Sequence, residues 1–456
     1  MKRFGPIVVG VCLVAAALGA CLGDDQAFAP PDAGPRGEAG VPDVGDMADA
    51  PTRRDVGPPD AAAADAGTIP KRVLLNLNGQ KTSEVVAFNL ETNTVDGRYV
   101  YPASFGTTFA RGDRPYLLQQ QIDVVARLDE REPWKVRSTW NVAEDGGFAD
   151  PAAVVAVSST KAYVLRFNKN RIHVIDPSVD ADGGLPTKVI DLSVLLQAGD
   201  SDGSVEPTSA VFVPSKKRLY VLLGNIDLSR VIPPRFEYLC SSLRSSLIAI
   251  DTDTDSLVPL GGSGPGGSIV LAAHNSPLGI DMAYDAVADR LVVLGAGCNE
   301  LIYRDAGPDS GPDAGPDAGP WIGPLRGRLV EEVKLTSPPV TRTMLDLGTK
   351  DFPLSFLFLN PTTAVVGFWG EAFLWDPRTT TLGPRLTSAP DTFAFDGKDA
   401  LVGVRSVPAG GGTTFEVVRA PFSFATPDAG PRVRLAGNPF ALPAGFLNGA
   451  EMWPRP

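Results

Sequence analysis

The sequence predicts an all-β fold for residues 71–456, built from seven similar units of four short strands. Apolar residues alternate with polar ones in short runs, and Gly, Pro, Asn and Asp separate the runs, which is the pattern of β-strands. Hairpin-like segments recur along the chain, and a segment that begins with proline precedes most of them. Repeated four-stranded units of this kind indicate a β-propeller, a ring of small antiparallel sheets.

Each unit contains one hairpin in which a polar turn joins two apolar runs. Asp or Asn in the turn accepts local hydrogen bonds from the backbone. The hairpins span residues 84–95, 123–136, 171–180, 246–258, 328–337, 371–382 and 415–424. The fifth and seventh are degenerate and are assigned on spacing as much as on residues. A further strand precedes each hairpin, as in RLYVLLGN and RLVVLGAG.

A proline begins the first strand of six units, where its missing N–H removes no hydrogen bond from a sheet. These prolines are Pro102, Pro151, Pro207, Pro277, Pro353 and Pro390. The first unit lacks such a strand, whereas the C-terminal segment that begins at Pro439 has no hairpin of its own. We therefore predict a seven-bladed β-propeller, closed when the C-terminal segment pairs with residues 72–78 of the first blade.

Residues 1–20 have the pattern of a signal peptide, with Lys2 and Arg3 followed by an apolar run that is short for a membrane span. The run ends in Leu18-Gly19-Ala20-Cys21, which resembles the lipobox of bacterial lipoproteins. The resemblance implies cleavage before Cys21, lipidation of Cys21 and, with Leu at the next position, an outer-membrane location on the periplasmic or surface side. The alternative is an ordinary secretory signal with a coincidental cysteine.

Residues 21–70 predict a disordered tether, because they are rich in Asp, Ala, Gly and Pro and have few large apolar residues to bury. The tether carries ten acidic and three basic side chains, about half of the negative charge expected of the mature chain. The remaining body is mildly acidic, which argues against nucleic acid as a partner. The lipid anchor makes the membrane itself the expected partner of the N-terminus.

Units three and four carry the segments AYVLRFNKNRIHVIDPSV and RLYVLLGN…SSLIAIDTDTDSLV. These segments resemble the YVTN-type, WD40-like propeller repeats of bacterial exported proteins. The resemblance is good in these two units and partial in the others. It implies the propeller fold but no particular function, because propellers serve many functions.

Two units are longer than the rest, with insertions at about 225–245 and 296–327, between the second and third strands. The second insertion contains DAGPDSGPDAGPDAGP, a tether-like run that a surface loop tolerates. Each insertion carries one cysteine, Cys240 and Cys298. Both loops are expected on one face of neighbouring blades, so we predict a disulfide between them. Two separate cysteines are the alternative.

The insertions also supply aromatic and arginine side chains of the types that anchor interfaces. The candidate binding face consists of Arg235, Phe236, Tyr238, Tyr303, Arg304 and Trp321. A protein or glycan partner would dock there. The alternative is that these aromatics pack inward and hold the long loops against the blades.

No catalytic residue, metal ligand or cofactor is predicted. His173 and His274 are expected to be solvated or hydrogen-bonded rather than a catalytic pair. Residues 251–256 (DTDTDS) are expected to form a hairpin turn rather than a calcium loop, whereas residues 200–206 (DSDGSVE) stay ambiguous.

The sequence therefore predicts a lipid-anchored cell-envelope propeller that acts as a binding or scaffolding module rather than as an enzyme. The alternative function is a propeller hydrolase or lactonase with a metal in the central channel, an expectation from fold analogy alone.

Overall fold

The computed structural model divides the chain into residues 1–69 and residues 70–456. It describes residues 71–79, 82–102, 106–110, 114–143, 148–227, 231–232, 237–274, 282–302, 321–348, 350, 353–360, 362–368, 371–387, 389, 392–396, 400–409, 412–422, 433–434, 440–441 and 445–453. The predicted signal peptide, Cys21 and the tether lie outside these residues. The described part is all-β, as predicted, with only short 3₁₀ turns besides the strands.

Sheets 1 to 3 come from the N-terminal half of the propeller region. Sheet 1 has the order β3-β2-β1-β33 and contains β1 (Arg72–Gly79), β2 (Ser83–Asn89), β3 (Thr94–Tyr101) and β33 (Gly445–Trp453). Sheet 2 contains β4 (Thr107–Ala110), β5 (Pro115–Gln119), β6 (Val124–Leu128) and β7 (Val136–Asn141). Sheet 3 contains β8 (Pro151–Ser158), β9 (Lys161–Arg166), β10 (Arg171–Ile175) and β11 (Lys188–Asp191).

Sheets 4 and 5 each pair their second and third strands across a long connection. Sheet 4 contains β12 (Pro207–Val213), β13 (Arg218–Leu223), β16 (Ser246–Asp251), β17 (Ser256–Val258) and β18 (Ile269–Val270). Sheet 5 contains β19 (Met282–Asp285), β20 (Arg290–Leu294), β23 (Leu329–Lys334) and β24 (Val340–Asp346). The connections form two small ribbons: β14 (Val231–Ile232) pairs with β15 (Glu237–Tyr238), and β21 (Cys298–Ile302) pairs with β22 (Trp321–Arg326).

Sheets 6 and 7 come from the C-terminal part of the propeller region. Sheet 6 contains β25 (Pro353–Asn360), β26 (Thr363–Phe368) and β27 (Glu371–Trp375). Sheet 7 contains β28 (Thr392–Phe395), β29 (Ala400–Ala409), β30 (Gly412–Pro421), β31 (Val433–Arg434) and β32 (Phe440–Ala441). The 3₁₀ turns are η1 (Gln120–Ile122), η2 (Ser193–Leu195), η3 (Pro214–Lys216) and η5 (Pro265–Gly267).

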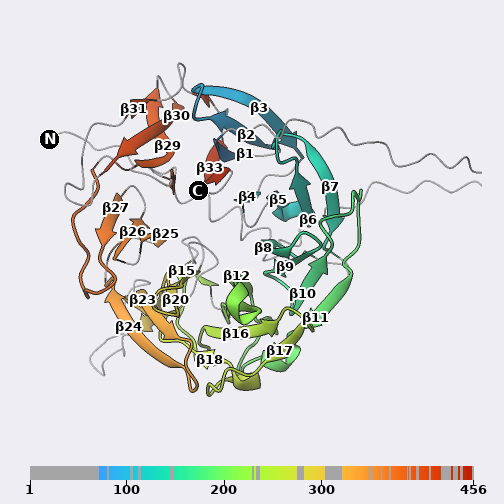
Figure 1. Ribbon diagram of the computed structural model, residues 1–456. Coiled ribbons are helices and arrows are strands. Elements are labelled where there is room, and N and C mark those ends of the chain that lie inside the picture. Colours follow the sequence, from blue (N-terminus) through green and yellow to red (C-terminus); the bar gives the residue numbers. More distant parts are fainter. Residues whose placement is uncertain are drawn as a thin grey trace, which may run out of the picture. The chain divides into compact units, whose positions relative to one another are not determined.

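The sheets follow one another around a common centre, the arrangement of a β-propeller (Figure 1). Strands such as β8, β12 and β25 lie toward the centre, and β3, β7, β11 and β24 lie at the periphery. The C-terminal strand β33 pairs antiparallel with β1, from Arg72 opposite Trp453 to Gly79 opposite Gly445. The first and last strands of the described chain therefore share one sheet.

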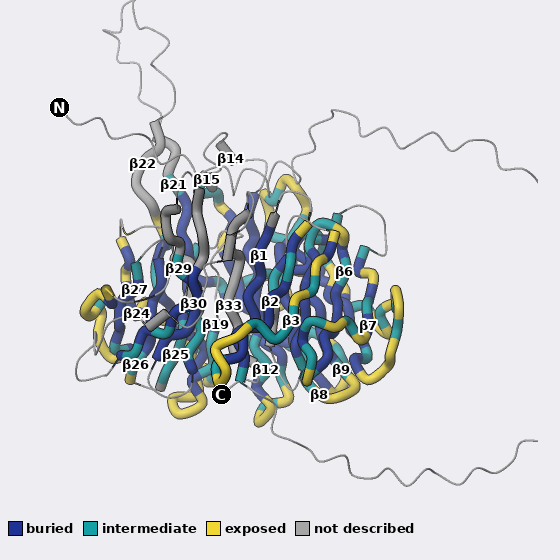
Figure 2. The backbone as a smooth tube through the Cα atoms, turned by 90° about the horizontal axis from the view of Figure 1, so that it is seen from above, coloured by how far each residue is buried: buried dark blue, intermediate teal, exposed yellow. Residues whose placement is uncertain are grey.

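Hydrophobic side chains fill the spaces between successive sheets. One cluster joins sheets 3 and 4 through Tyr163 and Leu219, and another joins sheets 4 and 5 through Leu222 and Leu291. Equivalent clusters join each of the other neighbouring pairs, including sheet 7 with sheet 1. Central strands pack on both faces, which is why β9 and β13 read as nearly continuous apolar runs. Figure 2 shows buried residues along the strands and exposed residues at the turns.

Three of the predicted prolines do begin strands: Pro151, Pro207 and Pro353. Pro102 does not, because Tyr101 directly before it still belongs to β3, and the chain must cross to sheet 2 before β4 begins at Thr107. Pro277, Pro390 and Pro439 lie outside the described residues.

Candidate functional site

The two inserted connections leave from equivalent places in neighbouring sheets. The first follows β13 and the second follows β20, and each returns as the third strand of its own sheet, β16 or β23. The sheet pairing therefore continues across each insertion. This arrangement brings the two ribbons to the same end of sheets 4 and 5.

A disulfide joins Cys240 to Cys298, as predicted, with the two Cα atoms 5.0 Å apart. The backbone supports this contact: the N–H of Cys240 donates to the carbonyl of Asn299 at 2.8 Å, and Leu239 forms a parallel bridge with Asn299. A covalent bond and a backbone contact thus tie the end of the first insertion to the start of the second.

The predicted binding-face side chains are placed only in part. Arg235, Phe236, Tyr303 and Arg304 lie outside the described residues. Tyr238 lies opposite Val231 in the first ribbon, and Trp321 lies opposite Ile302 in the second. The backbone thus places both aromatic residues on the disulfide-linked ribbons, and the gathering of the six side chains stays a prediction.

A small cavity of about 20 Å³ lies beside the disulfide. This volume has room for about one water molecule. The residues that line it come from both insertions and their bases: Gly224, Asn225, Ile226, Asp227, Leu239, Cys240, Ser241, Leu243, His274 and Cys298. This cavity is therefore too small for an organic ligand.

His274 forms part of this base. Its Nε2 lies 2.6 Å from Nη1 of Arg244, and burial together with the Arg244 charge lowers the pKa of His274 to about 4. The ring is therefore neutral at pH 7 and accepts a hydrogen bond from the guanidinium. The other histidine, His173, lies fully buried in β10 with its Nε2 2.6 Å from Arg166. Each histidine thus has an arginine partner of its own, in agreement with hydrogen-bonded histidines.

Backbone contacts hold the His274 segment against sheet 5. The His274 N–H donates to Gly327 at 3.0 Å, and the Gly297 N–H donates to the carbonyl of His274 at 2.8 Å. Gly327 has a φ of +67°, and a Cβ there would lie 2.3 Å from the His274 ring. Oε2 of Glu331 accepts the N–H groups of Ala272 and Ala273 just before the histidine. These contacts tie the segment between sheets 4 and 5 to β23 and the residues before it.

Two acidic residues occupy equivalent positions before the first strands of sheets 3 and 4; Glu206 belongs to the ambiguous segment 200–206, whereas Asp150 was not predicted as a site residue. Asp150 and Glu206 each precede a strand-initiating proline and have positive φ values, 51° and 41°. A residue before proline is normally extended, so this backbone is strained. Burial and then nearby Asp123 raise the pKa of Asp150 to about 7, and burial raises the pKa of Glu206. The sequence feature that could have identified both residues is an acidic residue directly before a proline that begins a strand.

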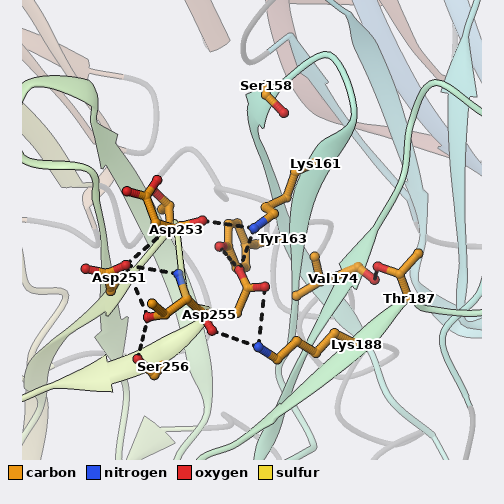
Figure 3. Close-up of polar contacts among 12 residues, drawn as sticks. Ser158, Lys161, Tyr163, Val174, Thr187, Lys188, Asp251, Asp253, Asp255 and Ser256 are labelled. Carbon is orange, nitrogen blue, oxygen red and sulfur yellow. Dashed lines mark hydrogen bonds and ion pairs between the residues drawn. The ribbon is translucent and has the colours of Figure 1, made fainter.

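The calcium-like segment 251–256 forms the turn between β16 and β17, as predicted (Figure 3). Oδ1 of Asp251 accepts the N–H groups of Asp253 and Thr254 at 3.0 Å each. The Asp255 carboxylate faces sheet 3, where Lys161 lies at 3.0 Å and the Tyr163 hydroxyl donates to it. These acidic residues therefore close a turn and link two sheets.

In the part of the chain that the structure describes, no three His, Cys, Asp or Glu side chains are placed to hold one metal ion. The described residues also contain no helix that is both long and apolar enough to cross a membrane.

Comparisons with known proteins support the fold and nothing finer. No protein-family model and no curated protein sequence matches the chain. Among solved structures, a hypothetical selenium-binding protein from Sulfolobus tokodaii is similar with a TM-score of 0.52 and 8% identity, over 85% of this chain and 94% of that chain. This likeness bears on the fold alone.

Two further similarities have lower TM-scores. A protein from Bacteroides fragilis titled "putative 6-phosphogluconolactonase" matches with a TM-score of 0.47 and 10% identity, over 85% of this chain and 99% of that chain. The β-propeller domain of Swd1 from Myceliophteria thermophila matches with a TM-score of 0.42 and 12% identity, over 73% of this chain and 92% of that domain.

Proposed function

We propose that this chain is a lipid-anchored outer-membrane protein whose β-propeller binds a protein or glycan partner through the inserted-loop face, defined as residues 225–245 and 296–327. The observation that carries the proposal is the disulfide between Cys240 and Cys298, which joins the two insertions. A covalent link between neighbouring loops lowers their conformational freedom before binding, and such preorganisation reduces the cost of association. Arg235, Phe236, Tyr238, Tyr303, Arg304 and Trp321 supply the expected anchors.

The proposal includes a seven-bladed propeller closed by the C-terminal strand. Two observations support it. The first is the pairing of β33 with β1. The second is that hydrophobic clusters lie between every two successive sheets, and one of them joins sheet 7 to sheet 1 through Val404 and Val73. An open row of sheets would leave its two end faces uncovered, and closure removes both.

Lipidation of Cys21 is the part of the proposal that the sequence alone supports. Mass spectrometry of the mature N-terminus should find an acylated Cys21, and a Cys21→Ser variant should leave the membrane fraction. An unmodified Cys21, or a mature chain that begins at another residue, would contradict lipid anchoring. It would not contradict the propeller fold.

The binding face is tested by in-cell crosslinking in the source bacterium. We expect one dominant crosslinked partner with the native chain, and its loss when Phe236, Tyr238 and Trp321 are replaced by Ala. A matched control replaces Leu185 and Val287, two exposed apolar residues outside the inserted loops, by Ala. Retention of the partner by the triple variant, or equal loss in the control, would contradict this face.

One observation favours the alternative, a hydrolase or lactonase. Burial and then the nearby Asp123 charge raise the pKa of Asp150 to about 7, a value suited to general acid–base chemistry. The test is hydrolysis of sugar lactones by the purified mature protein, with and without added divalent metal. Turnover that disappears in Asp150→Asn, with the fold retained, would favour the enzyme over the binding module.

A further inference from the structure

Two loops that together carry four acidic residues meet at the base of the first insertion. The loop 200–206 precedes β12, and the segment 224–227 follows β13. The N–H of Gly224 donates to the carbonyl of Glu206 at 2.8 Å, and the N–H of Ile226 donates to Oε2 of Glu206 at 2.7 Å. At the other end, the Ser201 hydroxyl donates to Oδ1 of Asp227 at 2.7 Å.

The loop 200–206 curls around its own acidic side chains. Oδ1 of Asp200 accepts the N–H groups of Asp202 and Gly203, at 3.2 and 3.0 Å, and Oδ1 of Asp202 accepts the N–H of Ser204 at 3.0 Å. Gly203 has a φ of +72°, which permits this tight turn. The turn leaves the second carboxylate oxygen of Asp200 for another partner.

Three buried oxygens in these loops have no hydrogen-bond donor: Oδ2 of Asp200, Oε1 of Glu206 and Oδ1 of Asn225. Glu206 is 0% exposed and Asn225 is 4% exposed. Among the described residues these are the buried side-chain carboxylate and amide oxygens without a hydrogen-bond partner, and all three belong to these two loops. A buried acceptor without a donor costs about 1–3 kcal/mol, so such groups point to a bound water or ion.

The negative charge of the loops favours a cation over a neutral hydrogen-bond donor as the partner of these oxygens. The Asp202 carboxylate lies near enough to add negative charge at both Glu206 and Asp200. Among the described residues, neither Asp200 nor Glu206 forms an ion pair with Lys or Arg. A bound cation would satisfy the three oxygens and remove the repulsion at the same time.

We propose that the loops 200–206 and 224–227 bind a calcium ion through oxygens of Asp200, Glu206 and Asn225, with Asp202 and Asp227 as further carboxylate ligands. Calcium takes six to eight oxygens and mixes carboxylates, amides and backbone carbonyls in flexible geometry. In the described residues no three acidic side chains already converge on one point. Binding therefore requires the exposed Asp202 to turn inward and uses the Asn225 amide as well.

This site lies where the first insertion leaves sheet 4, so the ion would fix the base of that insertion. It does not depend on the proposed partner or on the anchor. Asn225 and Asp227 also line the small cavity beside the disulfide.

The experiment is calorimetric titration of calcium chloride into the purified mature protein after removal of metals with EDTA. We expect one site per chain and a melting temperature at least about 2 °C higher in 10 mM calcium than in EDTA. The Asp202→Asn and Glu206→Gln variants should bind calcium at least tenfold more weakly. Asp202 is exposed, so its variant should fold even if the buried Glu206 variant does not.

The matched control is Asp253→Asn, which changes an exposed acid in the rival acidic turn 251–256. It should bind calcium like the native chain. Absence of binding heat, an equal loss in Asp253→Asn, or an equal response to magnesium would overturn the proposal. A Glu206→Gln variant that is more stable than the native chain and responds to calcium in the same way would also overturn the proposal. That result would show that a proton, rather than calcium, neutralises the Glu206 carboxylate.

Discussion

Arg244, near the end of the first inserted loop, contacts His274, with Nη1 of the arginine 2.6 Å from Nε2 of the imidazole. The arrangement requires a neutral ring, because two cations at this distance would repel each other. It makes the base of the inserted-loop face sensitive to acid.

The first prediction concerns this pH dependence. The folded pKa of His274, about 4, lies below the ordinary value of 6.5, so the unfolded chain binds the proton more readily between these values. The stability contributed by the neutral ring is full above pH 6.5 and is lost as the pH falls toward 4. Because His274 is partly exposed, we expect the free energy of unfolding to fall by about 1–2 kcal/mol over this pH range.

A His274→Gln variant keeps an acceptor for Arg244 but has no ring to protonate. Urea unfolding at pH 7 and pH 4.5 should therefore show a smaller acid loss in the variant than in the native chain. Equal losses in both proteins would show that the histidine does not titrate in this range.

The second prediction concerns Gly327. A Cβ at this position would lie 2.3 Å from the His274 ring, and the φ of +67° is strained for other residues. We expect Gly327→Ala to lower the free energy of unfolding by about 3 kcal/mol. Gly348→Ala is the control, because its φ is +55° but nothing lies within 4 Å of the added Cβ. It should cost about 1 kcal/mol, and equal losses would contradict the close contact.

The third prediction concerns the disulfide. The bond closes a loop with a sequence separation of 58 between Cys240 and Cys298, for which the chain-entropy argument gives about 4 kcal/mol. We expect the Cys240→Ser/Cys298→Ser variant to unfold at lower guanidinium concentration than the native chain. Under reducing conditions the two proteins should unfold at similar concentrations. A difference that persists after reduction would assign the effect to the substitutions themselves.

The fourth prediction concerns β33. Deletion of residues 445–456 removes the neighbour that pairs with β1 and exposes that edge. We expect the truncated protein to lose its cooperative melting transition and to self-associate in sedimentation experiments. Deletion of residues 1–70 is the control, because it removes no described strand. A truncated protein that stays monomeric and melts like the control would show that the pairing is dispensable.

The strands were predictable because their apolar runs must pack on both faces. The motif RLYVLLGN contains β13, and the motif SSLIAID contains β16, although a long insertion separates the two strands. Hydrogen bonding between their backbones fixes the register from Arg218 opposite Asp251 to Leu223 opposite Ser246. The disulfide was predictable for a related reason, since two insertions at equivalent places in neighbouring repeats must lie close together.

The polar sites were not predictable in the same way. Glu206 and Asn225 lie on different loops, and only the pairing of β12 with β13 brings them together. The strain at Asp150 and Glu206 is a backbone conformation, which residue spacing does not report. The start of β4 at Thr107 was missed because a proline at the end of one strand looks, in sequence, like a proline at the start of the next.

The pairing of the first strand with the last has a consequence for how the protein is made. During synthesis β1 is made early, and its inner neighbour becomes available only after residues 445–453 have been made. Contacts so remote along the chain form slowly, because a very long loop must close first. Sheet 1 is therefore completed only after β33 has been made, and until then the unpaired edge of β1 is exposed to aggregation.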